Sequence, residues 1–348
     1  MSEKEKKEDE NFTRFRKDIE NNKKTVLFVG AGVNRTQGQN LLWSDLLNYL
    51  LKHVMGKLNA TIEERKIIAE ALMEDGNKVE TMEILKLKMN ANQKFSSEVK
   101  ASIIKQLLGN FYIPLLQEFL YGWNVRSELR KGCEDFVAGK DAKDTSFHSL
   151  FSIADFILSH DNVEAVVTYN YDDYLSTAIN LLKQNDNYQP RIRHIIHPLD
   201  IYSGWKDEPF KTNCFAIYHI HGMIQPNNKV TPHCSNQVVL SLEEYYDMAR
   251  DTYSWHSATQ LFYLTHYTCA FIGASLADMT MQRVLHYANL NRSGENVYYL
   301  SAKASDGANE VLEILKNSYL ELLGLKVVYD KDGYEHLYKQ MNKITQKQ

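Results

Sequence analysis

The sequence predicts an α/β protein with a doubly wound, mostly parallel sheet and a large inserted α-helical module. In the last eighty residues, short apolar segments at 269–273, 297–301 and 325–329 alternate with helical patterns, as in sheets covered by helices on both faces. Near the N-terminus, the β-branched run 25–29 breaks abruptly into Gly30-Ala31-Gly32, which is typical of a strand that turns towards a helix. About a hundred residues between these regions carry helical periodicity only.

The chain begins with a polar segment. Residues 1–12 carry mixed charges with almost no apolar side chains, and we expect a flexible charged arm followed by a lead-in helix up to residue 22. The first part of the α/β core is assigned to residues 23–42, which contain the strand over 25–29 and the glycine turn.

Residues 43–159 are predicted to form the helical insertion. From Trp43 to Val54, six apolar side chains fall on one helical face. Further helical patterns are expected over 62–73, 80–90, 97–122 and 146–159, and Pro114 is expected to kink or split the third of these.

The rest of the core is assigned to residues 160–348. The segments that we expect to be strands before residue 269 are 163–169, 192–196, 215–220 and 237–241. The expected helices are 175–182, two or more over 242–265, one from Asp278, one over 308–323, and one at the C-terminus.

The glycine turn points to an anion. Glycines permit positive φ angles and close backbone approach, so that exposed N–H groups can face a pyrophosphate. A full dinucleotide fingerprint would have a third glycine at position 35, where this chain has Arg35. On this segment alone, a tight turn in any α/β protein is an equally good interpretation.

Three later strands also end in polar residues or glycine: Thr168 to Asp172 follow the second strand, His221-Gly222 another, and Gly273, Ser275 and Asp278 a third. Each set has a structural alternative, since Asx residues cap helices, a lone histidine is often structural, and small residues start helices. Ligands of open parallel sheets bind beyond the carboxyl ends of the strands. Four such ends together therefore favour one shared pocket.

Composition excludes several classes of protein. A net charge of −4 and a pI near 6.3 give no general electrostatic case for direct binding of nucleic acid or of an anionic membrane. The four cysteines form no CxxC pair, so no metal site is expected. We expect them to be free thiols in the cytoplasm. The N-terminus lacks the apolar segment of a signal peptide, and no run of eighteen apolar residues is present.

Four motifs together resemble a known family. GAGVN at 30–34, TYNYD at 168–172, HIHG at 219–222 and FIGASLAD at 271–278 occur in the order and approximate spacing of the sirtuin NAD-binding core, a Rossmann-like fold. The chain most resembles the sirtuin-like NAD-hydrolysing effectors of bacterial anti-phage systems, over about residues 24–330. It departs from sirtuin deacylases, because residues 222–268 hold only Cys234 in place of a zinc module with paired CxxC motifs.

The resemblance implies NAD as substrate, no zinc, and cleavage to nicotinamide and ADP-ribose. By similarity, Asn170 orients a water or the ribose hydroxyls, His221 acts as general base, and Asp172 binds the ribose or stabilises positive charge. The expected dinucleotide-binding residues are Gly30, Ala31, Gly32, Val33, Asn34, Thr168, Gly273, Ser275 and Asp278. Asp278 has a second interpretation as a helix cap. His219 is a weaker rival of His221, since both should point to one face if both lie on the strand.

Two alternatives remain open on the sequence: a non-catalytic module that senses NAD or ADP-ribose, and a deacylase that lost its zinc. The resemblance also implies a homo-oligomer, a complex with a defence partner such as a hexameric ATPase, or both, and NAD depletion (abortive infection) as the outcome.

Overall fold

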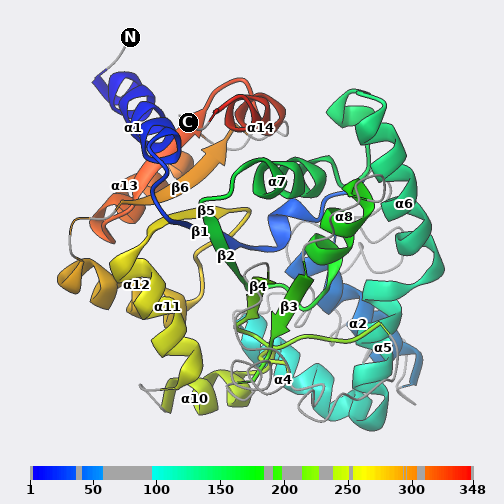
Figure 1. Cartoon of the computed structure of the whole chain (residues 1–348). Helices are drawn as coiled ribbons and strands as arrows, with labels where there is room; N and C mark the ends of the chain where they lie inside the picture. The colour runs from blue at the N-terminus through cyan, green and yellow to red at the C-terminus, as the bar shows by residue number, and fades with distance from the viewer. Residues whose placement is uncertain are drawn as a thin grey trace.

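A computed structural model describes residues 3–36, 41–57, 96–183, 191–197, 214–226, 238–250, 254–292, 294, 296–303 and 310–345. Within them, seven strands form one sheet, in which every neighbouring pair is parallel and the order is β3-β4-β2-β1-β5-β6-β7 (Figure 1). The strands are β1 (Thr25–Val29), β2 (Val163–Thr168), β3 (Arg191–Ile195), β4 (Cys214–His219), β5 (Thr268–Ile272), β6 (Val297–Ala302) and β7 (Lys326–Asp330). The predicted fold class is confirmed.

β1 lies inside the sheet, between β2 and β5, and all five of its residues are buried. Its side chains alternate between two apolar clusters, with Leu27 and Val29 in one and Val26 and Phe28 in the other. Because successive strand side chains point to opposite faces, this division means that helices cover both faces of the sheet.

Helices cover the two faces in two groups. Side chains of α1 (Glu3–Glu20), α7 (His148–Ser159), α8 (Tyr174–Leu182) and α14 (Tyr334–Asn342) share the first cluster. Side chains of α11 (Trp255–His266), α12 (Met279–Asn291) and α13 (Glu310–Leu322) share the second. The arm expected over residues 1–12 is helical from Glu3, and α1 packs its Phe15 edge-on against Tyr298 of β6.

The helices between β1 and β2 are α2 (Trp43–Lys57), α4 (Ser97–Leu108), α5 (Tyr112–Tyr121), α6 (Trp123–Val137) and α7; the expected helices at 62–73 and 80–90 lie outside the described residues. The expected helix over 97–122 is split, but not by Pro114. The break falls at Gly109, whose φ of +54° ends α4, while Pro114 lies in the first turn of α5, where an N–H has no helical acceptor to lose.

Two further differences concern the second half of the chain. Residues 238–240 of the expected strand 237–241 have irregular backbone, and they lead into α10 (Leu242–Arg250). Among the described residues, no helix is both long and apolar enough to cross a bilayer.

Candidate active site

The four strand ends that the sequence marked border one large cavity. Its volume is about 1260 Å³, and it lies at the carboxyl edge of the sheet. The predicted residues that line it are Gly30, Ala31, Gly32, Asn170, Asp172, His221, Gly273, Ser275 and Asp278. Three others do not line it: Val33, Asn34 and Thr168 are buried behind the wall.

The glycine turn is built for close backbone packing, and it does not use the positive φ angles that glycine permits. Gly30 has a φ of −112°, and neither Gly30 nor Gly32 is among the positive-φ glycines. A Cβ on Gly30 would lie 2.6 Å from the Gly273 carbonyl oxygen, and one on Gly32 would lie 2.8 Å from it. The glycines therefore let the turns after β1 and β5 interlock.

Backbone hydrogen bonds, two of them from the same packing, occupy most of the amides that were expected to face an anion. Gly30 N–H donates to Ile272 O at 3.0 Å, and Gly32 N–H donates to Gly273 O at 2.9 Å. Asn34 N–H bonds within the turn, to Ala31 O. Among the amides of residues 30–34, Ala31 N–H has no partner in the described part of the chain, and this residue lines the cavity.

Gly273 is the reciprocal half of the interlock. Its φ is +65°, and a Cβ there would lie 2.7 Å from the Val33 side chain, so both conformation and space call for glycine. Leu276, three residues later, also has a positive φ, of 55°. The loop from β5 to α12 is thus held in an unusual backbone path along the cavity.

Asn170 and Asp172 follow β2 and differ in their surroundings. Asn170 is a buried residue whose side chain makes no hydrogen bond with the described residues, so its amide is available to the cavity that it lines. Asp172 is fully engaged: Oδ2 accepts from Asn34 Nδ2 at 2.8 Å, and Oδ1 accepts from Tyr174 N at 3.0 Å. Burial raises the pKa of Asp172 to about 7, against the effect of these hydrogen bonds.

Thr168 and Asn34 support this pair from behind. The Thr168 hydroxyl donates to Val29 O and accepts from Asn170 N, which ties the end of β2 to β1. Asn34 donates to Asp172 but leaves its own Oδ1 without a partner. Both side chains position residues of the cavity wall.

His221 reaches the cavity because β4 ends before it. The strand stops at His219, and a turn through Gly222, with a φ of +80°, redirects the chain. The His221 ring lies edge-on between Tyr169 and Tyr245, with centroid distances of 5.3 and 5.5 Å. Its Nε2 is 3.2 Å from Asp278 Oδ2, and both side chains are largely buried.

His219 occupies different surroundings. Its Nε2 is 2.9 Å from Nδ1 of His194, and it lines a separate space of about 10 Å³. Burial lowers the pKa of His219 to about 3, with a smaller effect of His194. The expectation that both histidines share one face does not hold, because only His219 lies on the strand.

Several lining residues escaped the sequence analysis. Tyr169 and Tyr245 flank His221, and three lysines, Lys303, Lys316 and Lys331, line the cavity near β6 and β7. Tyr169 lies inside the TYNYD motif, but nothing in the sequence pairs Tyr245 of α10 with a histidine from another strand. The lysines follow apolar strands or lie on α13, where they read as ordinary solvated charges.

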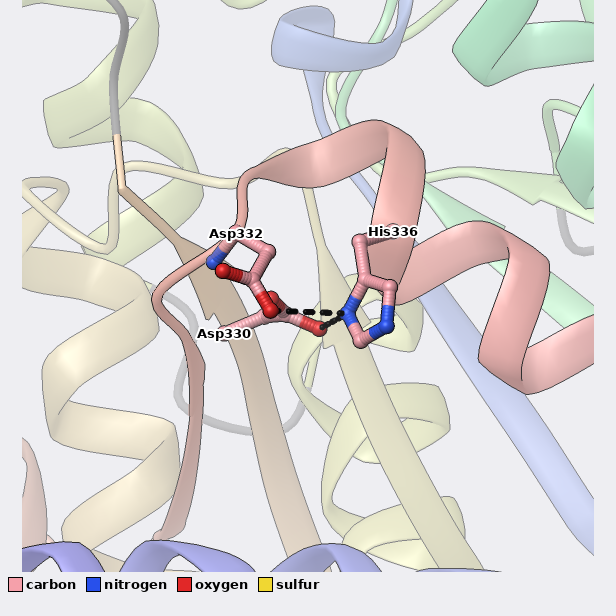
Figure 2. Close-up of side chains that lie close together, drawn as sticks. All are labelled: Asp330, Asp332 and His336. Atoms are coloured by element: carbon pink, nitrogen blue, oxygen red, sulfur yellow. Dashed lines mark hydrogen bonds and ion pairs between the residues drawn. The ribbon is translucent and has the colours of Figure 1, made fainter.

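One group of side chains at the edge of the cavity has the composition of a metal site, which was not expected from the sequence. Within the described residues, Asp330, Asp332 and His336 place ligand atoms within 4.8 Å of one another (Figure 2). Asp330 Oδ2 is 2.7 Å from His336 Nδ1, and Asp330 Oδ1 accepts from Asp332 N. The Asp332 side chain is 77% exposed. These bonds explain why the three residues lie together, because they hold the turn that joins β7 to α14.

Comparison with known proteins adds the family. No curated protein matches the chain as a relative. A family model described as a SIR2-like domain matches residues 164–344, from β2 to the end of α14 and just over half of the chain. The match contains the strand ends that carry Asn170, His221 and Gly273. The chain belongs to the SIR2-like domain family.

Proposed function

We propose that this protein is an NAD glycohydrolase that cleaves NAD to nicotinamide and ADP-ribose. SIR2-like domains are generally NAD-using enzymes, and the hydrolytic reaction is our inference. One observation carries it: Asn170, His221 and the interlocked glycine turns come from four strands and line one cavity at the carboxyl edge.

The chemistry requires little acid catalysis. Breaking the bond between nicotinamide and ribose develops positive charge at the anomeric carbon, and the cationic nicotinamide leaves as a neutral molecule. A buried carboxylate or amide oxygen beside that carbon stabilises this charge, because the electrostatic attraction between them is stronger in a water-poor site. Asn170 is suited to orient the attacking water or a ribose hydroxyl, since its amide has no partner in the described protein.

His221 is the proposed general base. Water attacks the anomeric carbon, the C–N bond breaks with its electron pair moving to nicotinamide, and the water proton passes to the imidazole directly or through a ribose hydroxyl. A positioned base of this kind typically contributes about 10²- to 10⁴-fold to a rate. Asp172, with its pKa of about 7, is partly ionised at neutral pH and supplies negative charge on the β2 side of the cavity.

The test is nicotinamide release from NAD by the purified chain, with Asn170→Ala and His221→Ala variants. Both variants should lose at least about 100-fold in kcat. His286→Ala is the matched control, because His286 is exposed on α12 and does not line the cavity. Release that survives both cavity substitutions would overturn the proposal.

Binding of NAD measured by calorimetry separates the main alternative. A protein that binds NAD tightly but releases no nicotinamide with any activating partner would be a sensor of NAD or ADP-ribose. Release of acetyl groups from an acetyl-lysine peptide would instead indicate a deacylase.

The physiological role that we propose is NAD depletion in the bacterial cytoplasm during phage infection. The support is the resemblance of the four motifs to NAD-hydrolysing defence effectors. Activation by self-assembly or by a partner such as a hexameric ATPase belongs to the same proposal. Cells expressing the chain should resist phage and lose NAD on infection, and cells expressing His221→Ala should do neither.

A further inference from the structure

The carboxylate of Asp278 has two separate surroundings, one for each oxygen. Oδ1 caps α12: it accepts from the amides of Thr280 and Met281 at 2.7 and 3.4 Å, and from the Thr280 hydroxyl at 2.6 Å. These bonds are those of an ordinary N-cap, which satisfies free amides in the first turn of a helix. They account for one oxygen only.

Oδ2 takes no part in the cap. It is buried, it has no aligned hydrogen-bond donor among the described residues, and it lies 3.2 Å from His221 Nε2. A carboxylate oxygen buried in this way is costly unless a donor faces it. Burial tends to raise the pKa of Asp278, but His221 and the bonds from Thr280 outweigh it and hold the pKa below its ordinary value.

His221 has few other polar neighbours. Tyr169 and Tyr245 meet its ring edge-on; the Tyr169 hydroxyl donates to Gln260 and is therefore committed elsewhere. Its second ring nitrogen, Nδ1, has no hydrogen-bond partner in the described part of the chain, and the ring lines the cavity. Asp278 is thus the charged group that faces this imidazole within the described residues.

We propose that Asp278 is a positioning residue, which holds the His221 ring with a proton on Nε2 and leaves the lone pair of Nδ1 for the ligand. A carboxylate can only accept, so the nitrogen facing it carries the hydrogen, and the neutral imidazole then has its free pair on the other nitrogen. This inference rests on the proposed NAD cleavage by His221. It assigns to Asp278 a role in the choice of tautomer, beyond capping α12.

Two substitutions separate capping from positioning, because asparagine and serine are both good N-caps. In Asp278→Asn, the amide oxygen can take over the cap, which leaves the NH₂ group opposite His221 Nε2. A donor at that place makes Nε2 the acceptor and moves the proton to Nδ1. In Asp278→Ser, the cap is kept and nothing faces Nε2.

The measurement combines kinetics with ¹⁵N NMR of the histidine side chains in the full-length protein. For Asp278→Asn, we expect kcat to fall about 10²- to 10⁴-fold with KM within about threefold, and the His221 nitrogen signals to exchange their protonated and unprotonated positions. For Asp278→Ser, we expect a smaller fall in kcat, of about tenfold, and a mixture of tautomers.

A purely structural role predicts another result. If both variants kept the wild-type kcat and the wild-type tautomer, the inference would be wrong and Asp278 would be a cap only. The tautomer measurement does not depend on activity. If Asp278→Asn switched the tautomer of His221 but His221→Ala still cleaved NAD, the proposed function would be wrong and the positioning role of Asp278 would stand. If one variant fails to fold, the other gives the same pair of readouts.

Discussion

Among single residues, Asp172 carries an ionisable group where its charge is disfavoured. Its buried carboxylate accepts hydrogen bonds from Asn34 and from the start of α8, and its burial raises the pKa to about 7. The ordinary value is near 3.8, so between about pH 4 and pH 7 the folded protein binds a proton that the unfolded chain has released. Stability therefore falls as pH rises through this range.

Asp172→Asn should remove this pH dependence. We expect the variant to match wild type near pH 4 and to exceed its free energy of unfolding by roughly 4 kcal/mol above pH 7, since the pKa rises from 3.8 to about 7 and one pKa unit corresponds to about 1.4 kcal/mol. Asn34 can rotate its amide, because its Oδ1 is unpartnered and can accept from the new NH₂ group. Urea midpoints at several pH values measure the difference; a difference that stays constant with pH would contradict the assignment.

Tyr245 provides the second prediction at this scale. Its ring lies edge-on against His221 at 5.5 Å, and its hydroxyl is not needed for that contact. Tyr245→Phe should keep kcat for nicotinamide release within about twofold, whereas Tyr245→Ala should lower it about tenfold or more by freeing the imidazole. Equal loss in both variants would show that the hydroxyl acts in the reaction.

Single residues also mark where sequence reasoning reached its limit. The residue types of Asn170, His221 and Gly273 pointed to one pocket, because strand order and strand ends follow from pattern. The choice between His219 and His221 could not be made from the pattern, since it depends on where β4 stops and on the turn at Gly222. The requirement for glycine at position 30 could not be predicted either, because it comes from contact with Gly273, which is 243 positions away.

At the scale of elements, the turns after β1 and β5 act as one unit. Gly30 and Gly32 pack on the backbone of Gly273, and Gly273 packs on Val33, so no methyl group fits at any of the three glycines without moving backbone. The interlock places Ala31 and Ser275 on one wall of the cavity. It links two strands that are adjacent in space but separated by most of the chain.

Gly30→Ala should therefore destabilise the protein by about 1–3 kcal/mol or more, as overpacking of a backbone contact does. Gly139→Ala is the matched control: Gly139 has open space around its Cα, so only its positive φ of 71° makes alanine costly, by about 1 kcal/mol. Thermal unfolding of the two variants tests this. A Gly30→Ala protein as stable as Gly139→Ala would show that the turns can separate freely.

Elements were predictable where periodicity is long and regular. The three C-terminal strands and their helices lie within a residue or two of their expected bounds. The differences lie earlier in the chain, at the break of 97–122 at Gly109 and at the irregular path of 238–240. That path is fixed by tertiary contacts: the Val239 amide donates to His221 O, and the Val239 carbonyl accepts from the Tyr171 hydroxyl. The sequence pattern of one segment does not reveal contacts with distant residues.

On the scale of the whole molecule, strand order gives the cavity a direction. His221 follows β4, Asn170 follows β2, the glycine turns follow β1 and β5, and Lys303 follows β6, in the order in which these strands lie side by side. Neighbouring strands are about 4.8 Å apart, so the path from β4 to β6 spans about 19 Å. If nicotinamide lies at His221, the adenosine half of an extended NAD molecule reaches the lysines.

Lys303 tests this direction, because it should touch only the adenosine half. Its side chain is exposed at the cavity, and an exposed ionic contact contributes about 0.2–1 kcal/mol, so Lys303→Ala should raise KM for NAD about two- to fivefold and leave kcat unchanged. With nicotinamide mononucleotide, which lacks the adenosine half, the substitution should change neither constant. Lys24→Ala is the charge-matched control, since Lys24 precedes β1 at the opposite edge of the sheet and pairs with Glu164. If Lys303→Ala raised KM equally for both substrates, the dinucleotide would have to lie in the reverse direction or along another path, and the assignment of the nicotinamide end to His221 would fail with it.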